Sequence, residues 1–379
     1  MAKKNITDEI KKYYSLKNIM KEDADYYLII GERSNGKTYS VEDFGLKDFC
    51  ESNYQNQMAI VRRWQDDFTG KRGQQMFDAL VSNGLVAKYT KGEWTHIYYR
   101  SSCWYLAKYD EKLDKIIPMG KPFCFGFSLN GGEHDKSTSY PNVKTILFDE
   151  FITRTRYLPD EFVLFMNILS TIIRDRDGVK IFMCGNTVNK YCVYFNEMGL
   201  GNVEKMQQGQ IDVYEYGESG LKVAIEYCKP NQLGKKSNKY FAFDNPKLQM
   251  ITGGAWEMNF YPHLPIKYEK KNIKYTYFIE FNKNVLQCEI IKVKTDRTHL
   301  FTYIHRKTST FKDLKKDRIY RPDYSSSPNH RRHITKPIDE IDEYVYSFYI
   351  EDRVFYQDNE VGEVIRNYLQ WSKTDRGFI

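Results

Sequence analysis

The apolar residues of this chain fall mainly into short runs that end in glycine or in polar residues, which is the pattern of buried β-strands. The clearest runs cover residues 27–30, 57–64, 142–151 and 179–184. A longer stretch, 159–174, instead repeats its apolar residues every three or four positions, as a helix with one buried face does. Strands that alternate with helices predict an α/β fold with a mostly parallel central sheet and helices on both faces.

The segment that follows the first run carries the strongest chemical signal. Residues 31–38 read GERSNGKT, which fits the phosphate-binding pattern G-x-x-x-x-G-K-[ST]. The glycines let the backbone curl so that successive N–H groups face the phosphates of a nucleotide. In such a loop Lys37 reaches the β- and γ-phosphates, and the Thr38 hydroxyl holds Mg²⁺. We therefore predict ATP and Mg²⁺ as cofactors, and phosphate-loop contacts from Gly31, Arg33, Ser34, Asn35, Gly36, Lys37 and Thr38.

Two later strand ends supply further candidate groups. The run 142–151 contains Asp149 and Glu150 where the strand is expected to end, and parallel strands deliver such residues to the same edge of a sheet. Asp149 is the candidate for supporting Mg²⁺, and Glu150 for activating the attacking water. Asn186 follows the run 179–184 and is the candidate sensor of the γ-phosphate. The acid pair favours water as the phosphoryl acceptor, and a P-loop kinase with another acceptor is the alternative.

Composition adds a possible nucleic-acid surface. The chain has 57 Lys and Arg against 50 Asp and Glu, a net charge of +7. Residues 306–336 hold ten basic and three acidic residues, and ten minus three equals the charge of the whole chain. Aromatic residues are interleaved with these charges, which is typical of nucleic-acid surfaces, although a solvated loop has the same composition. The candidate contacts to nucleic acid or to another acidic partner are Arg306, Lys307, Lys312, Lys315, Lys316, Arg331 and Arg332.

The remaining composition indicates the compartment. The seven cysteines are odd in number and show no C-x-x-C spacing, which favours a reduced cytoplasmic protein without a disulfide frame or a zinc site. The first residues alternate in charge and lack the apolar core of a signal peptide. No run approaches the roughly 18 consecutive apolar residues of a membrane-spanning helix, so no membrane association is expected.

Taken together, these segments resemble the DNA-packaging ATPase, or encapsidation protein, of small podoviruses, which is an FtsK-HerA-like P-loop motor. The resemblance rests on residues 31–38, 60–63, 135–151 and 173–176, and it continues weakly into 353–366. It implies an additional-strand (ASCE) P-loop domain and a smaller C-terminal α+β domain of RNase H-like fold that has lost its nuclease activity.

The resemblance also implies a function and a set of roles. It implies a homopentameric ring that moves double-stranded DNA into a procapsid and docks at the portal protein, directly or through a structural RNA. The motor would act from the host cytoplasm at the portal vertex. Glu150 becomes the catalytic glutamate, Arg174 an arginine finger offered in trans to the neighbouring subunit, and Lys136 a second trans-acting residue.

The predicted domains are an ATPase domain at 1–228, a lid and linker at 229–268, and a C-terminal domain at 269–379. Residues 1–25 are expected to form a charged helical arm, and residues 91–129 an antiparallel addition to the sheet. A second alternative is a terminase-like large subunit with an active C-terminal nuclease. Such a nuclease needs several carboxylates on two metal ions, and the sequence offers only an incomplete set: Glu280 with Asp358 or Glu360.

Overall fold

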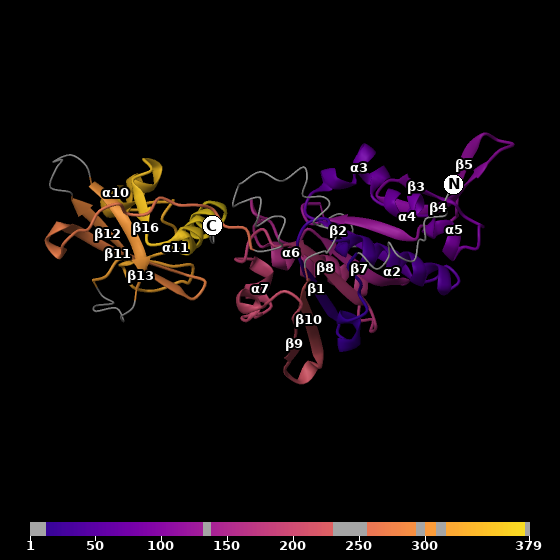
Figure 1. Ribbon diagram of the computed structural model, residues 1–379, viewed down its shortest axis with the longest axis horizontal. Coiled ribbons are helices and arrows are strands. Elements are labelled where there is room, and N and C mark those ends of the chain that lie inside the picture. Colours follow the sequence, from indigo (N-terminus) through magenta and orange to yellow (C-terminus); the bar gives the residue numbers. More distant parts are fainter. Residues whose placement is uncertain (1–12, 132–137, 230–255, 293–299, 308–315, 376–379) are drawn as a thin grey trace. The chain divides into compact units, whose positions relative to one another are not determined.

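The computed structural model describes residues 13–131, 138–229, 256–292, 300–307 and 316–375. The chain divides into two compact units, Met1–Glu257 and Met258–Ile379, which Figure 1 shows in sequence colours. The division falls inside the predicted lid and linker, most of which lies outside the described residues. Among the helices that are described, none is long and apolar enough to cross a membrane.

The first unit is built on a ten-stranded sheet. Nine of its strands follow the order β3-β4-β6-β2-β7-β8-β1-β10-β9, and β5 pairs with β4. Its centre is parallel and consists of β6 (Cys124–Ser128), β2 (Gln57–Arg62), β7 (Val143–Asp149), β8 (Lys180–Asn186), β1 (Tyr26–Gly31) and β10 (Leu221–Tyr227). β8 separates β1, which precedes the phosphate loop, from β7, which ends in Asp149. A strand inserted at this place defines the additional-strand P-loop fold, so the predicted fold class is confirmed.

Antiparallel strands extend this sheet at both edges. β9 (Ile211–Tyr216) pairs antiparallel with β10. At the other edge lie β3 (His96–Arg100), β4 (Cys103–Asp110) and β5 (Lys115–Pro118). These three strands confirm the antiparallel addition predicted for residues 91–129, while β6 in the same segment belongs to the parallel centre.

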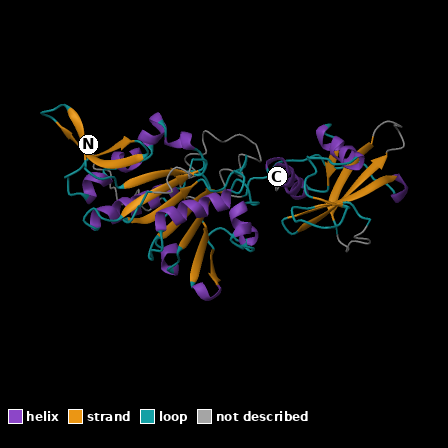
Figure 2. Ribbon diagram, turned by 180° about the vertical axis from the view of Figure 1, so that it is seen from behind, coloured by secondary structure: helices purple, strands orange, loops and turns teal. Residues whose placement is uncertain are grey.

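Helices cover both faces of the sheet (Figure 2). α2 (Lys37–Glu51) lies on one face, where its apolar residues share a core with Tyr27 and Ile29 of β1. α6 (Glu161–Ile173) shares the opposite core with Leu28 and Ile30. Because side chains alternate along a strand, β1 is buried on both faces, and this explains its uninterrupted apolar run. The shorter helices are α3 (Gly70–Gln75), α4 (Asp78–Ser82), α5 (Leu85–Tyr89) and α7 (Val193–Glu197).

The N-terminal segment differs from the prediction. Within residues 13–25 only Ile19–Glu22 form a single 3-10 turn, so the predicted helical arm is wrong for this part of the chain. The segment is instead held against the phosphate loop. The Tyr14 amide donates to the Asn35 carbonyl at 2.9 Å, and the Ser40 hydroxyl donates to the Tyr14 carbonyl at 2.6 Å. These tertiary contacts override the helical pattern of charges.

The second unit contains a six-stranded sheet in the order β15-β14-β11-β12-β13-β16. β11 (Ile273–Phe281), β12 (Asn284–Lys292) and β13 (Leu300–Arg306) form an antiparallel meander. The short strands β14 (Ile319–Tyr320) and β15 (His330–Arg331) continue parallel to β11, which is the strand order of RNase H-like sheets. β16 (Val354–Tyr356), α10 (Glu340–Ile350) and α11 (Asn359–Thr374) complete the unit.

A two-residue turn joins β11 to β12 in a hairpin. Its two turn residues, Asn282 and Lys283, have φ angles of 47° and 62°. A two-residue turn with positive φ at both positions matches the right-handed twist of paired strands, and asparagine tolerates this conformation well. The conformation of these two residues therefore fits the antiparallel pairing of β11 with β12.

Candidate active site

The phosphate loop joins β1 to α2 and exposes backbone amides at the start of the helix. Gly36 has a φ angle of 91°, a conformation that favours glycine, and a Cβ added there would lie 3.1 Å from the Tyr13 Cβ. Ser34 is also left-handed, with a φ angle of 58°. Left-handed residues in such a loop help to turn backbone amides toward one point, as in an anion-binding nest.

Lys37 is the buried centre of this loop, with 5% of its surface exposed. Its ammonium donates to the Glu32 carbonyl at 2.6 Å, to Asn35 Oδ1 at 3.2 Å and to Asn186 Oδ1 at 3.2 Å. Burial lowers the pKa of Lys37 below its ordinary value, because the low-dielectric surroundings disfavour its charge. A phosphate group bound here would stabilise the charged form of Lys37. The hydrogen bond between Lys37 and Asn186 also shows that the predicted lysine and the predicted sensor lie in one polar cluster.

The two predicted Mg²⁺ residues lie in direct contact. Thr38 Oγ1 donates a hydrogen bond to Asp149 Oδ1 at 2.8 Å, although 111 positions separate them in the sequence. A hydroxyl and a carboxylate oxygen are ligands that Mg²⁺ prefers, together with phosphate oxygens and water. The donor set therefore fits the ion predicted from the motif.

Arg62 is a site residue that the sequence interpretation missed. Its Nη2 lies 2.5 Å from Asp149 Oδ2, and its Nη1 lies 3.1 Å from Glu150 Oε2. Burial opposes the charge of Arg62, but Asp149 and Glu150 outweigh it and raise the pKa of the guanidinium. The contact follows from the pairing of β2 with β7, and no local signal in the sequence reveals that these strands are neighbours.

Glu150 has the exposure that a general base needs. It follows the last residue of β7 in a left-handed conformation with a φ angle of 59°. Its side chain is 62% exposed, whereas that of Asp149 is 7% exposed. One acid is thus enclosed beside Thr38, and the next faces solvent, where a water molecule can reach it.

The other predicted residues of the first unit lie around this centre. Gly31 ends β1, and its carbonyl accepts a hydrogen bond from the Thr187 amide at 3.1 Å. The Arg33 side chain is 57% exposed and lies 3.7 Å from Glu257 Oε1. Lys136 lies outside the described residues.

Arg174 lies at the C-terminal end of α6, about 20 Å along the helix axis from Glu161 by the usual helical rise. It has a left-handed φ angle of 43°, and its Nη2 donates to the Thr138 carbonyl at 2.8 Å. The neighbouring Arg176 donates to the carbonyls of Val143 and Ile172, at 3.0 and 2.7 Å, and so fixes this helix end to the start of β7. Arg174 and Glu150 therefore lie near opposite ends of α6.

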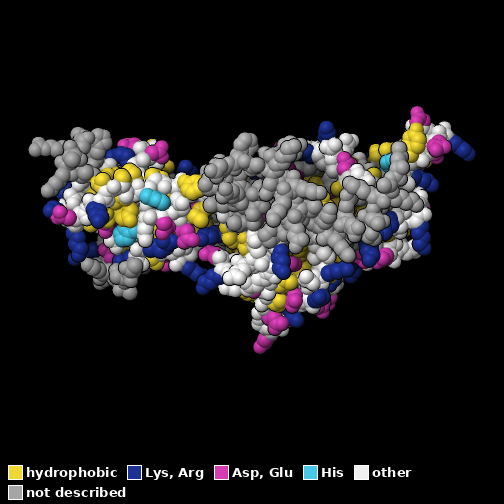
Figure 3. Space-filling view, viewed as in Figure 1, with side chains coloured by type: hydrophobic (Ala, Val, Ile, Leu, Met, Phe, Trp, Pro, Cys, Tyr) yellow, Lys and Arg dark blue, Asp and Glu magenta, His cyan; other side chains and the backbone are white. Residues whose placement is uncertain are grey.

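The basic stretch of the second unit is paired with acids that lie outside it in the sequence. Arg306 lies 2.5 Å from Asp358 Oδ2 and 2.7 Å from Glu360 Oε2. The Arg332 guanidinium stacks on the Tyr324 ring at 4.0 Å. On the face in Figure 3, basic and acidic side chains are mixed over this unit. Among the other candidates, the Lys307 ammonium lies over the Phe278 ring, and Lys316 is exposed. Lys312 and Lys315 are outside the described residues.

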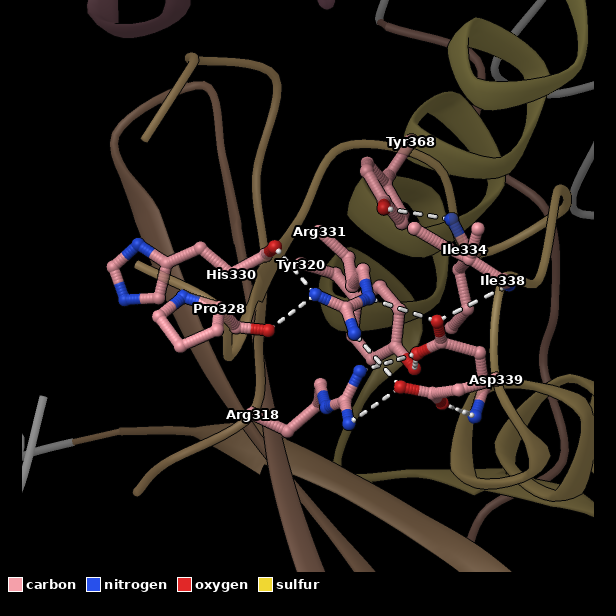
Figure 4. Close-up of polar contacts among 10 residues, drawn as sticks. Arg318, Tyr320, Pro328, His330, Arg331, Ile334, Ile338, Asp339 and Tyr368 are labelled. Carbon is pink, nitrogen blue, oxygen red and sulfur yellow. Dashed lines mark hydrogen bonds and ion pairs between the residues drawn. The ribbon is translucent and has the colours of Figure 1, made fainter. Parts of the chain in front are cut away.

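Arg331 and Arg318 form an ionic cluster with Asp339 and Asp342, and Figure 4 shows both guanidinium groups pointing toward Asp339. Arg331 Nη2 and Arg318 Nη2 lie 2.7 and 3.0 Å from Asp339 Oδ2. The same two arginines bind the carboxylate of Asp342, each at 2.9 Å, and Asp342 is 1% exposed. Arg331 therefore joins the sheet to the N-terminus of α10, and contact with nucleic acid stays a prediction for this residue.

This cluster makes the second unit sensitive to acid. Partial burial acts to raise the pKa of Asp339, but hydrogen bonds from the Asp342 amide, Arg331 and Arg318 lower it from 3.8 to about 2. A carboxyl group with a depressed folded-state pKa stabilises the fold above its unfolded-state pKa, and this stability is lost as the pH falls through the folded value. We expect Asp339→Asn to cost about 1–2 kcal/mol at neutral pH, after allowance for its partial exposure.

Urea unfolding of the wild type and of Asp339→Asn, followed by circular dichroism, checks this expectation. The difference in unfolding free energy should be constant above about pH 5 and shrink as the pH falls toward about 2. Asp323→Asn is the matched control, because Asp323 is 74% exposed and its ion pair with Arg321, at 3.2 Å, lies outside the cluster. A difference that does not change with pH would contradict the role given to the Asp339 carboxylate.

The fold and the contacts of Lys37, Thr38 and Asp149 define the chain as a P-loop protein of the additional-strand class. Comparison with known proteins places it further. Residues 116–219 match the family model described as Podovirus DNA encapsidation protein (Gp16). The matched segment includes β7, α6 and β8 and begins after the phosphate loop.

Curated relatives agree with this match, and a solved structure has a similar fold. The DNA packaging protein of Bacillus phage phi29 is 26% identical over 190 residues, which cover 48% of this chain and 50% of that protein. The DNA packaging protein of Bacillus phage B103 is 28% identical over 173 residues, 44% of this chain and 46% of that protein. The chain thus spans about half the length of the curated relatives it matches. A chain of the bacteriophage phi29 genome packaging motor assembly has a TM-score of 0.50 at 18% identity, covering 94% of this chain and 97% of that chain.

The resemblance drawn from the sequence motifs is therefore confirmed. Residues 116–219 are thus similar to the podoviral DNA encapsidation proteins, and the similarity to the phi29 DNA packaging protein extends over 190 residues.

Proposed function

We propose that this protein is a motor ATPase that moves double-stranded viral DNA into a preformed procapsid. The observation that carries the proposal is the convergence of Lys37, Thr38 and Asp149, with the solvent-facing Glu150 next to Asp149. Phosphate binding alone needs only the loop, whereas hydrolysis also needs a base that can reach water. The homology to DNA packaging proteins supports DNA as the substrate that is moved.

The residues of the site have separate tasks. Lys37 and the loop amides of Gly31, Ser34, Asn35 and Gly36 bind the phosphates of ATP. Thr38 and Asp149 would hold Mg²⁺, which would supply positive charge beside the phosphates of ATP. Glu150 takes the proton of the attacking water. Asn186, which is hydrogen-bonded to Lys37, senses the γ-phosphate. Arg33, at the exposed side of the loop, responds to the bound nucleotide.

The motor acts as a homo-oligomeric ring, which we take to be a pentamer. Each subunit offers Arg174, and with it Lys136, to the nucleotide of its neighbour. A cation that arrives from the next subunit stabilises the charge of the transferring phosphoryl group and makes hydrolysis depend on assembly. The ring acts in the host cytoplasm at the portal vertex and docks on the portal protein, directly or through a structural RNA. The solved phi29 packaging motor assembly supports an oligomer of this kind.

A packaging assay tests the whole proposal. Procapsids, DNA, ATP and the protein are mixed, and the DNA that becomes resistant to added DNase is measured. We expect ATP-dependent protection and its loss in Lys37→Ala. Hydrolysis without protection would point to a different ATPase, and phosphate transfer to a small acceptor without release of free phosphate would point to the kinase alternative.

The alternative with an active nuclease makes a different prediction. Glu280 lies 3.4 Å from Arg321 Nη1, and Asp358 and Glu360 pair with Arg306. Within the described ranges, no three His, Cys, Asp or Glu side chains form a group that could hold a metal ion. We therefore expect supercoiled plasmid to stay intact with the protein and Mn²⁺, and wild type and Glu280→Ala to behave alike. Cutting by the wild type that is lost in Glu280→Ala would favour the terminase-like alternative.

A further inference from the structure

Arg63 is a buried arginine next to the site that the proposed chemistry does not use. It follows β2, and only 6% of its surface is exposed. Its Nε and Nη2 donate to Glu161 Oε2 and Oε1 at 2.7 and 2.8 Å. This is a two-pronged ion pair, in which the planar guanidinium fixes the carboxylate in orientation as well as in distance.

The other edge of the same guanidinium holds the backbone that carries the general base. Arg63 Nη1 donates to the carbonyl of Glu150 at 3.2 Å, and Nη2 donates to the carbonyl of Phe151 at 3.0 Å. Glu150 has a left-handed backbone, which costs energy for a residue other than glycine and persists only where the surroundings hold it. The two carbonyl contacts supply such a hold.

Glu161 in turn fixes the start of α6. It is the first residue of the helix and is 1% exposed. Besides Arg63, its carboxylate accepts hydrogen bonds from the Leu158 amide at 2.7 Å and from the Tyr194 hydroxyl at 3.0 Å. Every partner is a donor, so this buried charge is fully compensated, and moving it would leave several groups unpaired.

The helix that starts here ends at Arg174. α6 spans 13 residues without a glycine or proline inside it, and such a helix moves largely as a rigid rod. A shift of Glu161 at the start of α6 should therefore also shift Arg174 at its end.

We propose that Arg63 is a positioning residue that anchors both catalytic groups of a subunit: Glu150 in its own site and, through α6, Arg174 in the site of its neighbour. This inference rests on the proposed function, because it needs Arg174 to act in trans. It goes further than that function, because it makes one side chain position both Glu150 in its own subunit and Arg174 at the neighbouring site.

Arg62 and Arg63 are adjacent in the chain but have different roles in this scheme. Arg62 touches the side chains of Asp149 and Glu150, so its loss alters the charge of one site. Arg63 touches the backbone of Glu150 and the first residue of α6, so its loss alters geometry at two sites. Lysine cannot replace Arg63, since a single ammonium cannot make the two-pronged contact with Glu161 and reach two carbonyls at once.

The test uses mixed rings on procapsids, with ATP hydrolysis as the readout. Glu150→Gln subunits have a sound Arg174, and Arg174→Ala subunits have a sound Glu150. We expect Arg63→Lys to bind an ATP analogue within about twofold of the wild type while hydrolysis falls roughly 10–100-fold. We further expect Arg63→Lys subunits to rescue neither of the two other variants.

The two mixtures separate the two halves of the proposal. Rescue with Arg174→Ala subunits would show that Arg63→Lys still presents its Arg174 correctly, and would overturn the shared anchor. Rescue with Glu150→Gln subunits would show that Glu150 is still correctly placed, with the same consequence. If Glu150→Gln and Arg174→Ala do not rescue each other under proven mixed assembly, the trans action of the proposed function fails instead.

A second measurement keeps the proposal testable if Arg63→Lys assembles poorly. Hydrogen exchange of the free protein should be faster in the second turn of α6, which begins with the bond from the Leu164 amide to the Asp160 carbonyl. We expect this in Arg63→Lys and in Glu161→Gln, which keeps the side-chain volume. Arg72→Lys, an exposed position in α3, is the matched control and should leave exchange unchanged. Wild-type exchange at α6 in both Arg63→Lys and Glu161→Gln would overturn the inference.

Discussion

Replacing Glu150 with glutamine should leave ATP bound and stop its hydrolysis. The amide has almost the same size as the carboxylate, but it cannot accept a proton from water at neutral pH. General-base catalysis contributes roughly 10²–10⁴-fold to such reactions, so we expect the turnover number to fall by a factor in this range. Lys37, Thr38 and Asp149 remain in place, so the affinity for the nucleotide should change little.

Release of phosphate and binding of a fluorescent ATP analogue together check this result. Asp160→Asn is the matched control: Asp160 is exposed, precedes α6 and makes no capping hydrogen bond through its side chain. We expect this control to hydrolyse ATP at the wild-type rate. Hydrolysis that survives in Glu150→Gln would assign the base to another group, while joint loss of binding and hydrolysis would give Glu150 a structural role.

The sequence predicted those parts of the site that have a local signal. The phosphate loop has a fixed spacing, and the acids at 149 and 150 follow an apolar run, so both could be placed on an α/β fold before any coordinates. What remained hidden was the lateral order of the strands. Arg62 contacts Asp149 across 87 positions of sequence, and this contact exists only because β2 lies next to β7.

The sequence also does not show which residues become neighbours of the basic stretch 306–336. A count of charges over 306–336 treats each residue as free to act on solvent or on a partner. In the folded unit, Asp339 and Asp342 lie just beyond the stretch and bind Arg318 and Arg331, and Asp358 binds Arg306 from the N-terminus of α11. A run of basic residues forms a charged surface only where the fold places no acidic side chains against it. The sequence does not show which acidic side chains the fold places there.

The second large effect is expected at the end of α6. Arg174→Ala should leave ATP binding intact and lower hydrolysis in the assembled ring by about 10³-fold or more, the usual contribution of an arginine finger. The helix itself should be preserved, because Arg176 supplies the hydrogen bonds that fix this helix end to β7. Asp175→Asn is the matched control next to it and should keep wild-type hydrolysis. Phosphate release in the presence of procapsids and DNA measures both.

Mixing then tests whether Arg174 acts on the neighbouring subunit. Neither Arg174→Ala nor Glu150→Gln rings should hydrolyse ATP, but a mixed ring contains interfaces where one subunit supplies Glu150 and the next supplies Arg174. In an equal, random mixture roughly one interface in four has this pairing, because every interface of a ring joins two different faces. Recovery toward a quarter of the wild-type rate is therefore expected if the interfaces fire independently, and less if they must fire in turn. A single turnover at each interface does not need the interfaces to fire in turn, so it is the decisive readout. No single-turnover hydrolysis in rings shown by native mass spectrometry to be mixed would count against the action of Arg174 on the neighbouring subunit.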